Sequence, residues 1–347
     1  MSAPSYAQPG LVLSLSSSFS ALVQDLQQDL RALGYFAGPI DGMFGTGTQT
    51  AVRALQYDLM HNTGSSSSGD GSAPVAVKNY NNGTVSSLTG VVDQDLVSCI
   101  AAMLADAAFP KVPFSLNPSQ DNQAALAAVQ SMSPNPVPVP FLMALLHQES
   151  SSAHYQVPNA SNRDHYVTTG LDRNNSASPL AISSRGYGIG QFTLFHHPPT
   201  ADEMASSIAD PVRNVSQTVS DLFDKFSHFL NGSTSDAQAD DRIHEHGMGP
   251  LRTCMHSPTD PRYMKDCVNC LRNAGVTNIV SGVTPVYAGA GSTYEKTQYH
   301  VGSYTNVPVR AAIPCDWPYA LRRYNGSGVN SYDYQAEVLQ KISSSHP

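Results

Sequence analysis

The sequence predicts a mainly α protein with two domains. Apolar residues recur every three or four positions in several segments, which is the spacing of amphipathic helices. Residues suited to helix N-caps precede some of these segments, and glycine or proline punctuates the connections. The chain has 347 residues, a length suited to about two domains that each bury a core. The segments with helical spacing are residues 20–34, 46–59, 93–104, 140–150 and 210–230.

Composition excludes two classes of function. Charged residues make up only 13% of the chain, the net charge is -8, and no stretch is strongly basic. A nucleic-acid partner is therefore not expected, because phosphate binding relies on clustered Lys and Arg. No apolar run approaches the roughly 20 residues that a membrane helix requires, so no membrane insertion is expected either.

The first two predicted helices are joined by the turn-rich sequence YFAGPIDGMFG. Residues 20–34 carry four leucines at helical spacing, and Ser20 precedes them as a suitable N-cap. Thr46 and Gln49 have the spacing of a capping box at the start of the second helix. Residues 61–89 have almost no apolar periodicity and are expected to form an exposed loop or linker.

The stretch LQQDLRALGYFAGPIDGMFGTGTQTAVRALQ resembles the small helical peptidoglycan-binding module found at the ends of many cell-wall hydrolases. The resemblance covers about forty residues and rests on LGY, G-x-I-D-G and F-G together. It implies a three-helix peptidoglycan-binding domain over residues 15–110 with a long inserted loop. Asp93 precedes the apolar stripe of the third helix as a suitable N-cap. The residues that it assigns to the wall-binding module are Tyr35, Asp41, Gly42 and Phe44.

A proline-rich connection, residues 111–139, leads to a second domain over residues 140–347. This domain opens with PFLMALLHQES, an apolar helix that ends close to Glu149. The negative end of the helix dipole and desolvation by neighbouring leucines are expected to raise the pKa of Glu149. A carboxyl that stays protonated near neutral pH is the general acid that cleavage of a glycosidic bond requires. Glu149 is therefore the candidate catalytic acid.

Two further motifs follow Glu149-Ser150 in the chain, namely SRGYGIGQFT at residues 184–193 and Y-N-G at residues 324–326. In this order the three motifs resemble the lysozyme-like fold that lytic transglycosylases and goose-type lysozymes share. The resemblance implies that Tyr324 lies near the Glu149 carboxyl and that Asn325 orders the turn presenting Tyr324. It also implies a sugar cleft flanked by a β-hairpin. The cleft residues are Tyr187, as a stacking surface, with Gly188, Gly190 and Gln191.

The reaction depends on a second carboxylate. Asp164 and Asp172 lie in a long segment between Glu149 and the glycine motif, where goose-type lysozymes carry acidic residues. A carboxylate about 6.5–9.5 Å from Glu149 activates water and gives inverting hydrolysis. Without one, Glu149 acts as acid and then as base, which leaves a 1,6-anhydro product. The residues slightly favour hydrolysis, although Asp172 equally fits a local turn.

The second domain carries an insertion at about residues 200–315 that contains most of the cysteines. Cys254, Cys267, Cys270 and Cys315 are compatible with two disulfides or with a structural zinc site, and the second C-x2-C pair typical of zinc sites is absent. Disulfides are favoured over zinc. We therefore expect no catalytic metal and no cofactor.

These observations predict a monomeric enzyme that binds peptidoglycan and cuts the β-1,4 bond between N-acetylmuramic acid and N-acetylglucosamine, as a muramidase or a lytic transglycosylase. A metal-dependent peptidoglycan amidase or peptidase and a non-catalytic wall-binding protein are the alternatives. The domain order resembles modular phage endolysins and secreted antibacterial effectors. We expect action on the wall in the periplasm or outside the cell. No secretory signal is recognisable, which favours release by a holin or a specialised secretion system.

Overall fold

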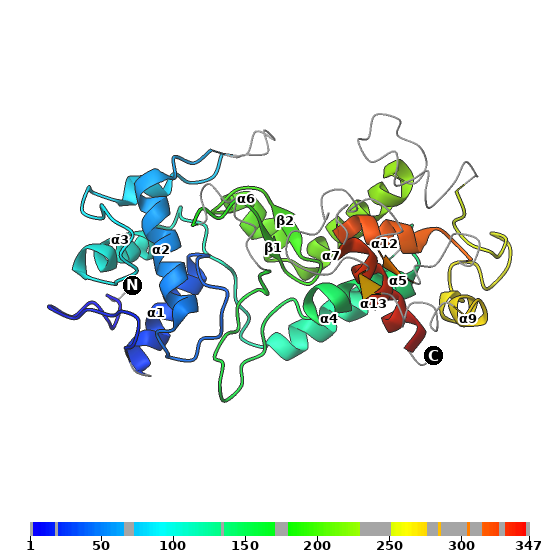
Figure 1. Cartoon of the computed structure of the whole chain (residues 1–347), viewed down its shortest axis with the longest axis horizontal. Coiled ribbons are helices and arrows are strands. Elements are labelled where there is room, and N and C mark those ends of the chain that lie inside the picture. Colours follow the sequence, from blue (N-terminus) through cyan, green and yellow to red (C-terminus); the bar gives the residue numbers. More distant parts are fainter. Residues whose placement is uncertain are drawn as a thin grey trace. The chain divides into compact units, whose positions relative to one another are not determined.

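The structure is a computed structural model that describes residues 3–17, 20–65, 73–132, 135–170, 180–229, 251–275, 284–285, 304–305, 314–325 and 330–344. These residues are mainly helical, as predicted (Figure 1). The chain forms two compact units: unit 1 is Met1–Leu126 with Ala153–Asn214, and unit 2 is Ala127–Ser152 with Val215–Pro347. The division differs from the expected domain boundaries, because residues 153–214 belong with the first module rather than with Glu149.

The first module of unit 1 contains the three predicted helices, α1 (Ala21–Ala32), α2 (Thr46–His61) and α3 (Gln94–Ala105). Two predicted N-caps are confirmed. The Ser20 hydroxyl accepts a hydrogen bond from Val23 N at 3.2 Å, and the Asp93 carboxylate accepts one from Leu96 N at 3.0 Å. The apolar faces form one core, whose fully buried members include Leu26, Leu30, Val52, Leu55, Leu96 and Ile100.

Two expectations for this module were wrong. Gly45 is the N-cap of α2 and provides no side-chain cap, so Thr46 and Gln49 form no capping box. The reason is that the helix begins at Thr46 itself, one residue earlier than a capping box with Thr46 as the N-cap requires. Residues 73–89 are also not a simple exposed loop, because they contain the 3-10 helix η1 (Val77–Tyr80), whose Val77 is fully buried.

The rest of unit 1 carries a short antiparallel hairpin, β1 (Arg185–Tyr187) and β2 (Phe192–Leu194). Its register pairs Arg185 with Leu194 and Tyr187 with Phe192. The single turn α6 (Ala201–Glu203) and the π-helix η2 (Met204–Ile208) follow it. The helices α4 (Pro118–Ser131) and α7 (Pro211–Asp224) each begin in unit 1 and end in unit 2.

One buried arginine joins the first module to residues 153–214. Arg31 of α1 lies 2.9 Å from Asp164, and both side chains are almost completely buried. The guanidinium also donates to the Phe36 carbonyl at 2.9 Å, to the Val167 carbonyl at 3.3 Å and to the Thr169 hydroxyl. Asp164 in turn accepts from Tyr166 N at 2.9 Å. Such a pair is costly to break, because removing one charge leaves the other buried and unpaired.

Unit 2 is built on α5 (Val139–Ser150), α12 (Trp317–Asn325) and α13 (Asn330–Ser344), which pack against one another (Figure 1). Its other elements are the π-helix η3 (Lys225–Phe229), α9 (Cys267–Asn273) and the paired strands β3 (Thr284–Pro285) and β4 (Tyr304–Thr305). Trp317 anchors α12, because its ring is fully buried and stacks on Phe226 with the centroids 3.9 Å apart.

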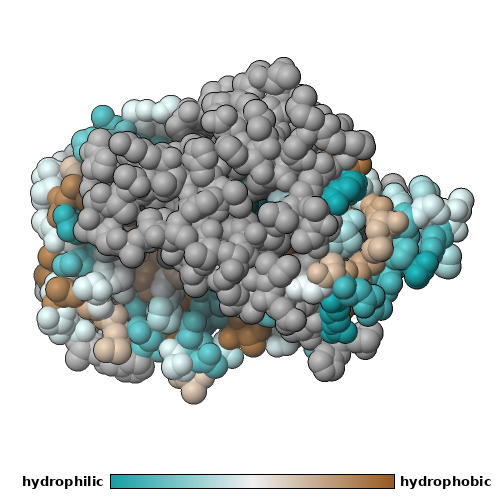
Figure 2. All heavy atoms as spheres, turned by 45° about the vertical axis from the view of Figure 1, so that its right-hand side comes forward, coloured by the Kyte–Doolittle hydropathy of each residue, from teal (hydrophilic) through white to brown (hydrophobic). Residues whose placement is uncertain are grey.

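The described surface carries apolar side chains in scattered positions. On the face in Figure 2, hydrophobic residues in brown are interspersed with hydrophilic residues in teal and with intermediate ones. Isolated apolar side chains of this kind are normal for a protein surface. Within the residues described, none of the helices combines the length and apolarity needed to cross a bilayer.

The ion pair between Arg31 and Asp164 yields a prediction about stability. Asp164→Asn is expected to lower the free energy of unfolding by about 3 kcal/mol, since Arg31 loses its buried counter-charge. Chemical denaturation measures this loss. The double variant Arg31→Met/Asp164→Leu should recover most of it. Arg213→Met, which removes an exposed pair with Asp210, should change the free energy by less than about 1 kcal/mol. An equally small effect of Asp164→Asn would contradict the structural role of this pair.

Candidate functional site

Glu149 lies in the last turn of α5, at the end of the apolar stretch that the sequence predicted. Leu145 and Leu146 are fully buried, whereas Glu149 is half-buried. The helix ends because Ser151 and Ser152 adopt left-handed backbone conformations, with φ of 54° and 62°. Their N–H groups donate to the carbonyls of His147 at 3.0 Å and Leu146 at 3.1 Å. This turn leaves Glu149 partly accessible at the rim of an apolar helix.

A tyrosine of α13 holds the Glu149 carboxylate. The Tyr334 hydroxyl donates a hydrogen bond to Oε1 of Glu149, and Tyr334 is 8% exposed. Burial, followed by the charge of Glu149, raises the pKa of Tyr334 well above its usual value. Tyr334 therefore remains a protonated donor across the physiological pH range. Sequence reasoning missed this residue, because nothing in its local pattern distinguishes it from an ordinary core tyrosine.

Tyr324 lies on the neighbouring helix, α12. Burial raises the pKa of Tyr324, the charge of Glu149 raises it further, and a hydrogen bond with Thr218 opposes the shift. The charge of Glu149 acts on Tyr324, the residue that the resemblance implied to lie near this carboxyl. Asn325 is the last residue of α12, and the Gly326 that follows lies outside the described residues.

The residue before Glu149 is clamped by the same face of α13. The Gln148 amide donates to the carboxylate of Glu337, and its oxygen accepts from Lys341 Nζ at 2.6 Å. Tyr334, Glu337 and Lys341 are spaced three and four residues apart, so they lie on one face of the helix. This face fixes the last turn of α5 and with it the position of the Glu149 carboxylate.

A second carboxylate acts on the same tyrosine. Asp221 of α7 contributes to the raised pKa of Tyr324, and its own pKa is raised by burial. The Gln217 amide donates to Asp221 at 2.9 Å, so the side chain has a fixed orientation. Sequence analysis did not select Asp221, because it lies on an amphipathic helix that reads as core.

The glycine motif forms the turn of the β1–β2 hairpin in unit 1, whereas Glu149 belongs to unit 2. Gly188 has a φ of 75°, and a Cβ there would approach both Asn214 and His154 to 2.7 Å. The Gln191 amide donates to the Gly188 carbonyl at 2.8 Å and closes the turn. Gly190 N donates to Asn214 Oδ1 at 2.9 Å. Glycine is thus required at position 188 by backbone conformation and by close neighbours.

His154 and Asn214 shape this turn and were also missed by sequence reasoning. Ile189 N donates to His154 Nδ1 at 3.3 Å, while His154 Nε2 donates to the Ile208 carbonyl at 2.9 Å. The Asn214 amide donates to the Tyr187 carbonyl at 2.9 Å. A neutral imidazole with its proton on Nε2 satisfies both contacts of His154. The residues lie 24 to 54 positions from their partners, a separation that no local pattern reveals.

Several predicted contact residues have structural positions instead. Tyr187 is fully buried, so its ring is not accessible for stacking on a sugar. In the wall-binding module, Tyr35 and Phe44 are only 3% and 2% exposed. The Tyr35 hydroxyl donates to Asp58 at 2.8 Å, and Asp41 accepts from Gln27 at 3.0 Å. Gly42 has a φ of 79°, and its N–H donates to Gln27 at 2.8 Å. These residues make internal contacts that stabilise the loop between α1 and α2.

Asp164, one of the two predicted second carboxylates, is not placed as a catalytic group. Asp164 is engaged in the buried pair with Arg31 in unit 1, which accounts for its burial. This position disfavours a role in activating water. Asp172 lies outside the described residues.

The four cysteines of the predicted insertion gather in unit 2. All five cysteines of the chain are described, and none forms a disulfide, so the favoured expectation of two disulfides is not met. One cavity is lined by Phe141, Thr253, Cys254, Met255, Cys267, Cys270, Leu271, Pro314 and Cys315. The residues with metal-binding side chains in this region are therefore Cys254, Cys267, Cys270 and Cys315, together with His256 and Asp266.

The buried imidazole of His154 yields a prediction about pH. Burial lowers the pKa of His154 from 6.5 to about 4, against the opposing charges of Asp210 and Asp121. The stability that neutral His154 contributes is complete above about pH 6.5 and is lost as the pH falls toward 4, because the unfolded chain takes up the proton first. The full difference is about 3 kcal/mol.

Urea unfolding of wild type and His154→Gln between pH 7 and pH 4 measures this contribution. Other groups of unit 1 titrate in the same interval, so the informative quantity is the difference between the two proteins at each pH. We expect wild type to lose more stability than the variant on acidification. An equal change in the free energy of unfolding of the two proteins over this pH range would contradict the assignment of a neutral, buried His154.

Comparison with known proteins bears on the first module. Residues 20–59 match the family model described as "Putative peptidoglycan binding domain". No curated protein and no solved structure matches the chain. The match spans α1, the turn-rich connection and most of α2, which are the residues that carried the resemblance in the sequence. The chain therefore contains a peptidoglycan-binding domain at residues 20–59, and peptidoglycan is its indicated partner.

Proposed function

We propose that this protein cleaves the glycan strand of peptidoglycan at the β-1,4 bond between N-acetylmuramic acid and N-acetylglucosamine, with Glu149 as the general acid. The observation that carries the proposal is the setting of Glu149. Its carboxylate lies at the end of an apolar helix, is half-buried, and accepts a hydrogen bond from Tyr334. The peptidoglycan-binding domain at residues 20–59 supplies the substrate class.

Cleavage of a glycosidic bond requires an acid. The departing sugar oxygen is a poor leaving group unless it receives a proton as the bond breaks. Glu149 is partly accessible, so its carboxyl reaches a bound strand, while Leu145 and Leu146 exclude water from the side of the helix core. The hydrogen bond from Tyr334 fixes the orientation of the Glu149 carboxyl. Tyr334 is thus a positioning residue.

The fate of the sugar depends on the second carboxylate. With Glu149 alone, the same group takes back a proton from the 6-hydroxyl of the muramic acid residue and a 1,6-anhydro end forms. Inverting hydrolysis requires a carboxylate that activates water. Asp221 of unit 2 is a candidate for this role, because its charge, like that of Glu149, acts on Tyr324. Asp164 is not used in this proposal, since Arg31 already neutralises it.

The peptidoglycan-binding domain favours reaction on an insoluble polymer. Binding through residues 20–59 raises the local concentration of scissile bonds, so a modest affinity is enough to support a slow enzyme. Residues 1–126 and 153–214 form one compact unit, so the peptidoglycan-binding domain and the β1–β2 hairpin belong to the same unit. Wall binding and cleavage are separate properties and can be measured by separate assays.

Glu149→Gln is expected to fold normally, to bind purified wall, and to lose about 10²- to 10⁴-fold of the cleavage rate, because the amide has no proton to donate. Release of soluble muropeptides measures cleavage, and sedimentation with the wall measures binding. Asp95→Asn is the control, because it removes an exposed carboxylate from the first turn of α3 in unit 1. Wild-type release by Glu149→Gln would remove Glu149 from the mechanism.

Tyr334→Phe removes only the hydroxyl that donates to Glu149. We expect a loss of about 10-fold or more in cleavage rate, from the energy of a hydrogen bond to a charged group. The pH–activity profile should also move to higher pH, since the lost donor favoured the carboxylate form. Tyr319→Phe, on α12, is the control for removal of a tyrosine hydroxyl from the same unit. A reduced rate with an unchanged pH profile would show that Tyr334 contributes only to packing.

Mass spectrometry of the released fragments separates the reaction classes. Muramidase action leaves reducing N-acetylmuramic acid ends, and transglycosylase action leaves 1,6-anhydro ends. If Asp221 activates water, Asp221→Asn should lose the reducing-end product. Intact glycan strands with free stem peptides would instead indicate an amidase or peptidase. Wall binding without any soluble fragment would indicate a non-catalytic protein.

A further inference from the structure

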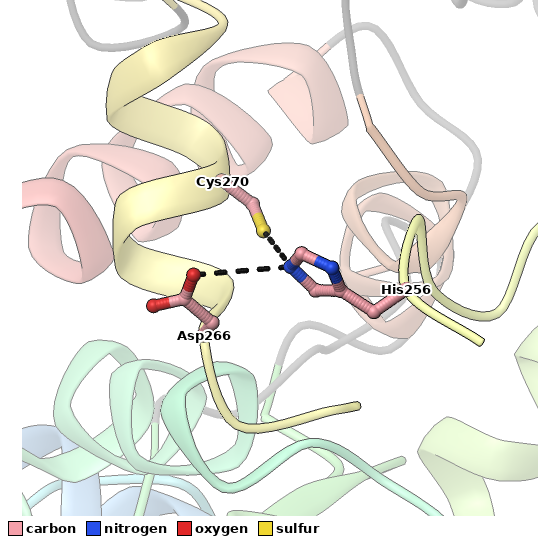
Figure 3. Close-up of side chains that lie close together, drawn as sticks. All are labelled: His256, Asp266 and Cys270. Carbon is pink, nitrogen blue, oxygen red and sulfur yellow. Dashed lines mark hydrogen bonds and ion pairs between the residues drawn. The ribbon is translucent and has the colours of Figure 1, made fainter. Parts of the chain in front are cut away.

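The loop before α9 and the first turn of this helix bring together three side chains of different chemistry. His256 Nε2 lies 3.4 Å from Cys270 Sγ and 3.8 Å from Asp266 Oδ2 (Figure 3). The three donor atoms all lie within 4.8 Å of one another. Metal–ligand bonds of about 2.0–2.3 Å in a tetrahedral site place neighbouring donor atoms between 3 and 4 Å apart. The observed spacing therefore suits one ion bound by all three groups.

The cavity lined by Cys270 offers a fourth donor. Cys254 lines the same cavity as Cys270, and its sulfur accepts a hydrogen bond from Met264 N at 3.4 Å. Met264, two residues before Asp266, has a φ of 56° that turns the chain back toward Cys254. Both Cys254 and Cys270 are partly exposed, so an ion has access to them.

The surroundings of His256 support a metal ligand. Its second ring nitrogen, Nδ1, lies 3.7 Å from Asp260 Oδ2. A carboxylate that faces the far side of an imidazole orients the ring of many metal-binding histidines and fixes its tautomer. Arg262 holds Asp260 through two contacts, of 2.7 and 3.0 Å. Nε2 is therefore directed toward Cys270 and Asp266, on the side where an ion would be bound (Figure 3).

We propose that unit 2 binds one Zn²⁺ ion through Cys254, His256, Asp266 and Cys270, as a structural site. Two thiolates, an imidazole and a carboxylate form a tetrahedral donor set suited to zinc. On binding, the thiols of Cys254 and Cys270 lose their protons to the buffer, and the zinc ion keeps its oxidation state. All four positions are filled by protein, so the ion stabilises the fold and takes no part in bond cleavage.

This ligand set differs from the four-cysteine site considered from the sequence. Cys267 and Cys315 line the same cavity, but they are only 8% and 7% exposed. Their neighbours on the cavity wall include Phe141 and Leu271, which surround the thiols with apolar atoms. We assign them to packing, where a free cysteine acts as a small apolar side chain. His256 and Asp266 take the two positions that the sequence pattern had given to cysteines.

Metal content and cobalt spectroscopy of the reduced, full-length chain test the proposal. We expect one equivalent of Zn²⁺ per chain, and Co²⁺ substitution should produce tetrahedral d–d bands with thiolate-to-cobalt charge-transfer absorption. Cys270→Ser should lose these signals, and His256→Ala should weaken binding by 10-fold or more. Cys99→Ala in unit 1 and Cys315→Ala on the cavity wall are the controls and should retain both. Neither measurement depends on Glu149 or on cleavage, so its outcome is independent of the proposed function.

A second measurement on the wild-type chain avoids variants that fail to fold. Zn²⁺ should slow alkylation of Cys254 and Cys270 by iodoacetamide, and a chelator should restore the rate. The proposal is overturned by an absence of bound metal in the reduced protein, by undiminished binding in Cys270→Ser, or by loss of binding in folded Cys315→Ala. Metal-independent alkylation, or a disulfide between Cys254 and Cys270 in the protein as purified, would overturn it as well.

Discussion

The buried ion pair between Arg31 and Asp164 determines how the first half of this protein is organised. Arg31 belongs to the peptidoglycan-binding domain, and Asp164 lies more than a hundred residues later, beyond the helix that carries Glu149. A guanidinium buried without a counter-charge is strongly unfavourable, so residues 153–170 must pack on α1 for the domain to keep its core. The wall-binding domain is consequently not an independent module joined by a linker. It shares a compact unit with the hairpin that the glycine motif forms.

The local sequence predicted the helices well, and tertiary contacts account for what it missed. The leucines of α1 and the N-caps Ser20 and Asp93 could be recognised because a helix is specified by residues three and four positions apart. The family match at residues 20–59 confirms the resemblance that this pattern carried. The division into units could not be predicted, because it depends on a contact between α1 and Asp164 that has no periodicity.

The candidate site shows the same limit. Glu149 stood out because a lone carboxylate ends an apolar segment, but its partner Tyr334 lies 185 residues away in sequence. Tyr187 looked like a sugar-stacking residue because it lies between glycines, yet alternation along a three-residue strand gave no clue that this position faces the core. His154 and Asn214 likewise act on the glycine turn through space. Residues of the types that carry chemistry could be recognised in the sequence. Their partners could be identified only from the folded structure.

The proposed metal site and the proposed catalytic acid share one scaffold in unit 2. Helix α9, which begins beside the ligands, packs against both α5 and α13. These two helices carry Glu149 and Tyr334, whose hydrogen bond defines the site. An ion that binds only the folded protein stabilises it in proportion to the logarithm of its concentration over the dissociation constant. Zinc would then hold α9 in place and restrain α5 and α13 through packing, without any contact with the substrate.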